Sequence, residues 1–179
     1  MSAAFILSTP RLLLRPLGEA NAPRLAAYRN DPEVARYQGW ELPFTPAIAA
    51  EFIAAMAGRL PGDPGWVQLG LEARASGELL GDVALNTSGQ QAELGVTLAR
   101  EAQGQGYAVE GLRALLDHAF GPLGLHRVHA GIDPRNLAVT RLLVRLGFRH
   151  EGTHRSSYLH RGEWTDEAIW AMLAAEWTR

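Results

Sequence analysis

The chain has 179 residues, of which 47% are hydrophobic and 20% charged, with a formal net charge of −2. Such a length and composition predict one globular domain over residues 1–179, with a core that needs no disulfide or metal. The absence of cysteine excludes disulfides, Cys-ligated zinc and a thiol nucleophile. All 17 basic residues are arginine, which excludes a catalytic or Schiff-base lysine. The charge balance argues against a nucleic-acid partner.

The N-terminal segment carries no targeting signal that we recognise. Met1–Pro10 has no positive charge before its short apolar run, unlike a secretory signal. No apolar run approaches the ~18 residues that a membrane span requires. We therefore expect a cytoplasmic protein with no membrane partner.

The first elements are a strand and two helices. Thr9–Leu17, bounded by prolines, predicts a strand. Glu19–Asn30 predicts a helix, with Pro23 tolerated in its first turn. Thr45–Gly58 carries apolar residues at helical spacing behind a Thr-Pro start, which predicts a second helix.

The middle of the chain predicts an antiparallel meander. The apolar runs Trp66–Ala73 and Glu78–Asn86 are joined by Ser76-Gly77, which is a hairpin signal. Ala92–Leu98 follows as another strand.

The second half alternates helices and strands. The patterns predict a helix over Gly106–Phe120, a strand over Arg127–Ile132, a helix over Asn136–Leu146, and strands over Phe148–Leu159 and Thr165–Leu173. The resulting order β-α-α-β-β-β-α-β-α-β-β indicates a mixed α/β fold.

One segment, Glu93–Ala108, combines a strand, a glycine-bearing turn and a helix start. The first turn of a helix leaves backbone N–H groups without partners and carries the positive end of the helix dipole. Gly104 and Gly106 allow the backbone to approach a ligand closely. The segment therefore predicts a site for a phosphate or pyrophosphate.

Four interpretations of this turn compete. A dinucleotide-binding G-x-G-x-x-G match stops at Val109, and the preceding strand is expected to be antiparallel. A Walker A loop is excluded because G-K-[ST] is absent. The glycines could also mark an ordinary helix start. Finally, Gln103-x-x-Gly106-x-Ala108 resembles the Q/R-x-x-G-x-G/A motif of the GNAT acetyltransferases.

The resemblance to GNAT acetyltransferases covers nearly the whole chain and favours the RimJ/RimL branch, which contains ribosomal-protein N-terminal acetyltransferases. The matching segments are Thr9–Leu17 (T-x-R-L-x-L-R), Gly81-Asp82 (G-D), Glu93–Gly95 (E-[IL]-G), Asp133–Phe148 (N-x-x-S-x-R-V-x-x-x-x-G-F), Glu151-Gly152 and Trp164–Asp166. The resemblance implies a central, mostly antiparallel twisted sheet flanked by helices. It also implies that Ala92–Leu98 and Arg127–Ile132 form a splayed parallel pair.

The resemblance further implies acetyl-CoA as co-substrate, without a metal. Its pyrophosphate would lie on the amides of Gln103–Ala108 and its pantetheine beside Val96–Leu98. Asn136 would contact the pantetheine arm, although Asn is equally suited to cap the helix that follows. Arg141 would contact the phosphates or lie on a solvated helix face. The implied cofactor-binding residues are Val96, Thr97, Leu98, Gln103, Gly104, Gln105, Gly106, Tyr107, Ala108, Asn136 and Arg141.

The catalytic candidates are Glu93 and Tyr158. Glu93 stands where the family often has an acid, and it could accept the amine's proton or be a structural carboxylate. The family's proton donors are absent, because Val139 replaces a serine and Leu143 a tyrosine. Tyr158, on a late strand, could reach the cleft instead. A thiol with a pKa of ~8.5 is a tolerable leaving group even without an acid.

No metal site is expected, since the histidines form no H-E-x-x-H pattern. Trp40, Phe44 and Trp66 could line an acceptor pocket, and the loop Tyr37–Thr45 is the candidate for substrate selection.

The sequence thus predicts direct transfer of acetyl from acetyl-CoA to a primary amine. A protein N-terminal α-amine is the acceptor that the resemblance implies. The alternatives are a small amine, an amino acid or an antibiotic as acceptor, and a non-catalytic acyl-CoA-binding module. The expected partner is the amine substrate, and a homodimer is the assembly to test.

Overall fold

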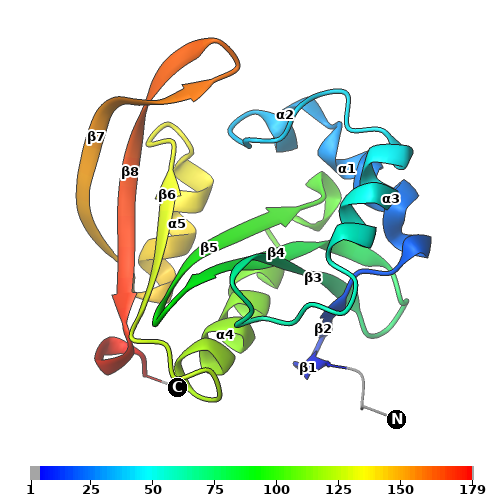
Figure 1. Cartoon of the computed structure of the whole chain (residues 1–179), viewed down its shortest axis with the longest axis horizontal. Coiled ribbons are helices and arrows are strands. Elements are labelled where there is room, and N and C mark those ends of the chain that lie inside the picture. The colour runs from blue at the N-terminus through cyan, green and yellow to red at the C-terminus, as the bar shows by residue number, and fades with distance from the viewer. Residues whose placement is uncertain (1–4, 179) are drawn as a thin grey trace.

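The computed structural model describes residues 5–178. The expectation about Met1–Pro10 falls in part on residues 1–4, which lie outside this range. Within it, the strands form one sheet of eight, in the order β1-β2-β3-β4-β5-β6-β8-β7, with helices on both faces (Figure 1). The strands are β1 (Leu7–Ser8), β2 (Leu12–Pro16), β3 (Gly65–Ala73), β4 (Leu79–Ser88), β5 (Gln91–Leu98), β6 (Arg127–Ile132), β7 (Arg149–His160) and β8 (Glu163–Leu173). The α-helices are α1 (Ala22–Arg29), α2 (Pro32–Ala35), α3 (Pro46–Ala55), α4 (Tyr107–Phe120) and α5 (Leu137–Leu146), and three 3₁₀ turns are η1 (Glu19–Asn21), η2 (Arg100–Ala102) and η3 (Ala174–Glu176). The predicted mixed α/β class is confirmed.

The first predicted strand is wrong in its extent. Thr9 lies in a tight reversal, where its backbone N–H donates to the carbonyl of Leu12 (2.9 Å) and its hydroxyl accepts from the N–H of Leu12 (2.9 Å). The chain therefore folds back, and β1 pairs antiparallel with β2. The local hydrogen bonds of a threonine outweigh the strand pattern here.

The first predicted helix is also divided. It starts as the 3₁₀ turn η1, continues as α1, and is followed by the short helix α2, which the sequence analysis missed. Asp31 caps α2 by accepting a hydrogen bond from the N–H of Glu33 (2.9 Å). An Asp-Pro start is a recognised helix signal, but four residues are too few for a hydrophobic period to show.

The two faces of the sheet are covered by different helices. On α4, a Cβ at Gly111 would lie 2.7 Å from Cδ2 of Leu71 on β3, so the missing side chain allows helix and sheet to pack closely. The buried leucines of β2, β3 and α4 form the core between them. On the opposite face, Tyr28 and Arg29 of α1 contact the buried Asp82 of β4.

The parallel pair separates as expected. Strand β5 pairs with β6 only at Gln91↔Arg127, Ala92↔Val128 and Glu93↔His129. Beyond Glu93, β5 remains paired with β4 as far as Leu98, while β6 remains paired with β8 as far as Ile132. Within residues 5–178, the edges of β5 and β6 that face each other beyond these pairs have no strand between them.

No helix in the described part of the chain is long and apolar enough to cross a membrane.

Candidate active site

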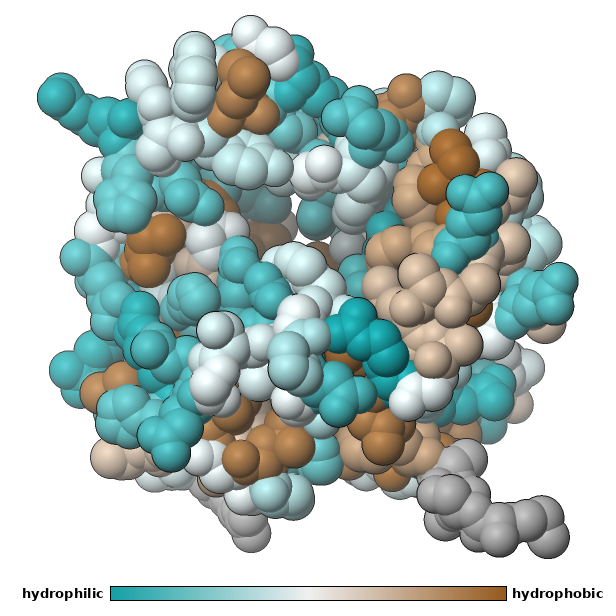
Figure 2. Space-filling view, viewed as in Figure 1, coloured by the Kyte–Doolittle hydropathy of each residue, from teal (hydrophilic) through white to brown (hydrophobic). Residues whose placement is uncertain are grey.

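Two cavities adjoin where β5 and β6 separate. The larger, about 710 Å³, lies between α2, β5, α4 and α5, and the smaller, about 360 Å³, lies between β5, β6 and the β7–β8 hairpin. Figure 2 shows the surface hollowed between the half with β6 to β8 and the half with α1 to α3. The residues bordering both cavities, which we call the throat, are Tyr37, Gln38, Val96, Asn136 and Val139. A ligand in the larger cavity can therefore meet a second ligand in the smaller one.

The glycine-bearing turn borders the larger cavity. Gly104 and Gly106 have φ of 74° and 83°, a left-handed conformation that favours glycine. Gly106 is the N-cap of α4 without a side-chain cap, and the N–H of Glu110 donates to its carbonyl (3.1 Å). The N–H groups just before Glu110 thus precede the helical hydrogen-bond ladder. Free N–H groups at the start of a helix are suited to bind an anion, as the sequence analysis expected of this turn.

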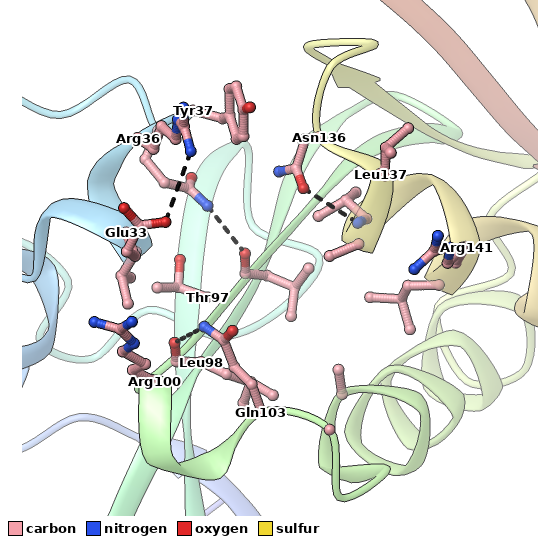
Figure 3. Close-up of a pocket in the computed structure, with 18 of the residues that line it drawn as sticks. Glu33, Arg36, Tyr37, Thr97, Leu98, Arg100, Gln103, Asn136, Leu137 and Arg141 are labelled. Carbon is pink, nitrogen blue, oxygen red and sulfur yellow. Dashed lines mark hydrogen bonds and ion pairs between the residues drawn. The ribbon is translucent and has the colours of Figure 1, made fainter.

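The side chains of Gln103, Gln105 and Tyr107 in this turn make different contacts. Gln103 lines the larger cavity, and its Nε2 donates to the carbonyl of Leu98 at the end of β5 (3.1 Å; Figure 3). The Gln105 amide donates to the carbonyl of Glu101 (2.7 Å), and the Tyr107 ring lies 4.4 Å from the Arg11 guanidinium. Neither Gln105 nor Tyr107 lines either of the two cavities.

The other predicted cofactor residues line the larger cavity together. Val96, Thr97 and Leu98 supply one wall from β5, with Ala108 on α4. Across from them, Asn136 and Arg141 come from the start and the first turns of α5 (Figure 3). The structure thus brings these six residues to one space, although they come from three separate elements.

Of the two roles that the sequence left open for Asn136, the structure shows the helix cap, and the contact with a pantetheine arm stays a prediction. Its Oδ1 accepts a hydrogen bond from the N–H of Val139 (3.3 Å), so it caps α5. It also lines both cavities, with its side chain at the throat.

The sequence analysis missed several cationic residues of the larger cavity. Arg36, Arg100 and Arg145 border it in addition to Arg141. Arg36 is paired with Glu33 (3.7 Å), and both carry side chains on the α2 side of the cavity (Figure 3). Arg36 could have been found only by recognising α2. Arg100 could have been found because it immediately follows β5 and precedes the turn.

Glu93 lies in the smaller cavity and is about half-buried. Burial raises the pKa of its carboxyl, and the negative charge of Glu167 raises it further, while a hydrogen bond with Asn86 acts in the opposite direction. A carboxylate with a raised pKa binds a proton more readily, which suits a general base.

Further carboxylates surround Glu93. Asp133, Asp166 and Glu167 all border the smaller cavity. Asp133 is paired with Arg135 (2.7 Å), and Asp166 accepts from the N–H of Ser156 (2.8 Å). The cavity therefore has a negative character, in contrast to the arginine-rich larger cavity.

Tyr158 borders the smaller cavity and is 43% exposed. Its hydroxyl lies 2.6 Å from where a Cβ of Gly39 would be, so the β7–β8 hairpin packs closely on the loop after α2. Val139 and Leu143, where the family's proton donors were expected, also border this cavity. The structure brings Tyr158 and Glu93 to the same cavity.

The aromatic candidates for the acceptor pocket divide into two groups. Trp66 borders the smaller cavity. Trp40 and Phe44 border neither cavity and instead surround the Arg29 guanidinium at 4.6 and 5.0 Å. The prediction that Trp40 and Phe44 line an acceptor pocket is thus wrong, because a buried cation attracts their rings.

Arg29 belongs to a buried polar cluster between α1 and β4. Its Nη2 donates to Oδ1 of Asp82 (3.2 Å), and the Tyr28 hydroxyl donates to Oδ2 (2.6 Å). Burial, followed by the charge of Asp82, raises the pKa of Tyr28. The Arg29 carbonyl accepts from Nε1 of Trp40 (3.1 Å), so the cluster holds the loop that carries Gln38.

Among residues 5–178, no three His, Cys, Asp or Glu side chains gather in a way that could hold a metal ion.

Comparison with known proteins identifies the family. Residues 11–149 match the family profile described as "Acetyltransferase (GNAT) domain", and the chain therefore belongs to this family of N-acetyltransferases. It is 30% identical to the uncharacterized N-acetyltransferase p20 of Bacillus licheniformis over 174 residues, covering 96% of this chain and 97% of p20.

Other similar proteins belong to the ribosomal-protein acetyltransferase group, as the sequence motifs predicted. The [ribosomal protein uS5]-alanine N-acetyltransferase of Escherichia coli is 33% identical over 85 residues, covering 48% of this chain and 44% of that protein. The solved ribosomal-protein-S5-alanine acetyltransferase of Vibrio fischeri shares the fold, with a TM-score of 0.84 and 20% identity, covering 98% of this chain and all of that one (100%).

Proposed function

We propose that this chain, acting as one domain, transfers the acetyl group of acetyl-CoA directly to a primary amine. The observation that carries the proposal is the throat, where a cavity with backbone donors and arginines meets a cavity with carboxylates. An anionic cofactor and a cationic amine would each enter the side whose charge is opposite to its own.

The larger cavity fits coenzyme A in its chemistry. The amides near Gly104 and Gly106 can hold a pyrophosphate, since a Cβ at Gly104 would meet no atom within 4 Å and the backbone there is open to a ligand. Arg100 and Arg141 supply positive charge for phosphate oxygens. Asn136 can hold the pantetheine arm. Acetyl-CoA supplies the activated acyl group.

The residues of the chain act mainly by positioning and by polarising the thioester. Beyond Glu93, the edge of β5 that faces β6 offers backbone groups without a strand partner to the substrate's carbonyl oxygen, on which negative charge develops. Glu93, on the amine's side of the throat, would accept the amine's proton directly or through a water molecule, because only a neutral amine attacks. Tyr158 is the remaining candidate for returning a proton to the thiolate.

We propose a protein N-terminal α-amine as the acceptor. The support is the similarity to an enzyme named for acetylating the alanine of ribosomal protein uS5. A small amine, amino acid or antibiotic is the second acceptor class. It is supported by the small volume of the acceptor-side cavity, about 360 Å³. Cytoplasmic location and homodimer formation stay predictions.

A thiol-release assay tests the proposal. The purified chain is incubated with acetyl-CoA and either peptides with different N-terminal residues or a panel of small amines, and free coenzyme A is measured with a thiol reagent. The proposal expects release that depends on the acceptor, with the acetylated product seen by mass spectrometry. Acetyl-CoA binding without release across the panel would favour a non-catalytic binding module. Failure of coenzyme A to bind would overturn the assignment.

A further inference from the structure

We propose that Gln38 determines the length of the acyl group, by closing the throat to chains longer than acetyl. The inference rests on the proposed function and goes beyond it, because it names the thioester class that the enzyme accepts. Gln38 borders both cavities and is partly buried.

The Gln38 side chain reaches across the throat to β5. Its Nε2 is 3.5 Å from the carbonyl oxygen of Val96, a residue that also borders both cavities. The Gln38 side chain therefore lies between the loop after α2 and the edge of β5, where the acyl group must meet the amine.

The backbone of Gln38 is fixed, so this placement does not depend on a mobile loop. Its N–H donates to the carbonyl of Ala35 (3.0 Å), and its own carbonyl accepts from Nη2 of Arg161 (3.5 Å). The same arginine donates to the carbonyl of Trp40 (3.2 Å). The β7–β8 hairpin thus holds the loop from one side.

The other throat residues are less suited to block an acyl chain. Val96 packs against the hydrophobic core, and its strand is paired with β4. The Asn136 side chain caps α5. Tyr37 lies beside arginines, with its ring 5.6 Å from the Arg36 guanidinium. Val139 contributes a short apolar wall from α5. Among the throat residues, Gln38 has the longest flexible side chain that could be removed while the surrounding elements stay in place.

The chemistry explains why length matters at this point. In the transfer, the carbonyl carbon loses its bond to sulfur and gains one to the amine nitrogen, the amine proton passes to a base, and coenzyme A leaves as a thiol. The carbonyl carbon must therefore lie at the throat. In this proposal, any carbon beyond the acetyl methyl extends from it and meets the Gln38 side chain.

The experiment compares binding of acetyl-, propionyl- and butyryl-CoA to four proteins by isothermal titration calorimetry. The proteins are the unmodified chain, Gln38→Ala, Gln38→Asn and Gln90→Ala. Gln90 is exposed in the turn between β4 and β5 and borders neither cavity, so it controls for the loss of a glutamine side chain.

One extra methylene in a closed pocket changes affinity by ~10-fold or more. The unmodified chain and Gln90→Ala should therefore lose at least about tenfold in affinity from acetyl- to butyryl-CoA, and Gln38→Ala should bind the three thioesters within about threefold of one another. Gln38→Asn, which is one methylene shorter, should give an intermediate profile. This second variant keeps the test decisive if Gln38→Ala does not fold.

Two results would overturn the inference. One is equal binding of acetyl- and butyryl-CoA by the unmodified chain. The other is a chain-length profile that stays the same in the Gln38 variants. Failure of the proposed function has a different signature: either no thioester binds at all, which defeats both, or the thioesters bind with the expected length profile but no amine triggers release of the thiol.

Discussion

The two cavities are built in different ways. In the larger cavity, the proposed donors for an anion are backbone groups of one short stretch around Gly104 and Gly106, which is continuous in the sequence. In the smaller cavity, the polar groups are mainly side chains from β5, β7 and β8, and Glu93 is far in the sequence from Tyr158 and Glu167. A site made of backbone groups survives most side-chain changes, whereas a site made of side chains can be altered one residue at a time.

The largest expected effect concerns the buried Arg29–Asp82 pair, which joins α1 to β4. We expect Arg29→Met to lower the free energy of unfolding by about 3–5 kcal/mol, because Asp82 would be left as a buried charge without its partner. For a chain of this size, about 2–4 °C of Tm accompanies each kcal/mol, so calorimetry should show a fall of at least about 6 °C.

The pair Arg127–Glu151, in which the Glu151 side chain is 46% exposed, provides the control for this change. Glu151→Gln should alter stability by less than about 1 kcal/mol, because solvent screens exposed ion pairs. If the two variants lost similar amounts of unfolding free energy, the burial of Arg29 and Asp82 would not explain the effect of Arg29→Met.

The next prediction tests whether a residue of the smaller cavity affects turnover without affecting the binding of acetyl-CoA. Glu93→Gln should lower kcat by about 100-fold, because a general base contributes at least this much, while the acetyl-CoA dissociation constant changes less than about threefold. Kinetics with a confirmed acceptor, together with calorimetry, measure the two quantities. Unchanged turnover would assign Glu93 a structural role.

The pH dependence of kcat/KM sharpens the same test. Glu93 acts as a base only when unprotonated, so activity is present above its pKa and is lost as the pH falls through it. Since burial and Glu167 raise this pKa, the acid limb of the profile should lie above the ordinary glutamate range. Glu167→Gln removes one cause and should move that limb to lower pH. A limb that does not move would contradict the role of Glu167.

A substitution disrupts a binding site made of backbone groups only where the new side chain blocks the ligand's approach to the backbone. We expect Gly104→Val to weaken coenzyme A binding by about tenfold or more, because hydrogen bonds to a charged phosphate are worth ~1.5–3 kcal/mol each and a branched side chain would lengthen them. Gly89→Val is the matched control, since both glycines have positive φ and a Cβ at either would meet nothing within 4 Å. The two should lose similar stability, but only Gly104→Val should lose affinity.

The smallest effect concerns the proton for the leaving thiolate. Tyr158→Phe should lower kcat by less than about fivefold, because a thiol with a pKa of ~8.5 leaves without much help from an acid. Leu159→Ala, next to it on β7 and also exposed, is the control for packing of the hairpin. A loss of 100-fold or more in Tyr158→Phe alone would make Tyr158 a necessary acid.

The sequence predicted best those features that depend on neighbouring residues. The helix expected over Gly106–Phe120 is observed as α4 over Tyr107–Phe120, because its apolar period and its glycine start are both local. The separation of β5 from β6 was expected from the family resemblance rather than from the residues themselves, and the structure confirms it.

The features that the sequence did not predict depend on distant contacts or on very short elements. Arg29 sits in an ordinary helical pattern, and only the folded chain shows that Asp82 and three aromatic rings surround it. Gln38 follows a four-residue helix that has no detectable period, and its place at the throat requires β5 and α5 to meet there. No local pattern contains this information.

The short contact between β5 and β6 has a consequence for how a bound ligand changes the stability of the protein. Three residue pairs join the two strands, so the sheet is weakly held together along this line. A pantetheine arm between them would bridge the two halves as a third, removable strand. Ligand at 100 times its dissociation constant adds about 2.7 kcal/mol to the free energy of unfolding.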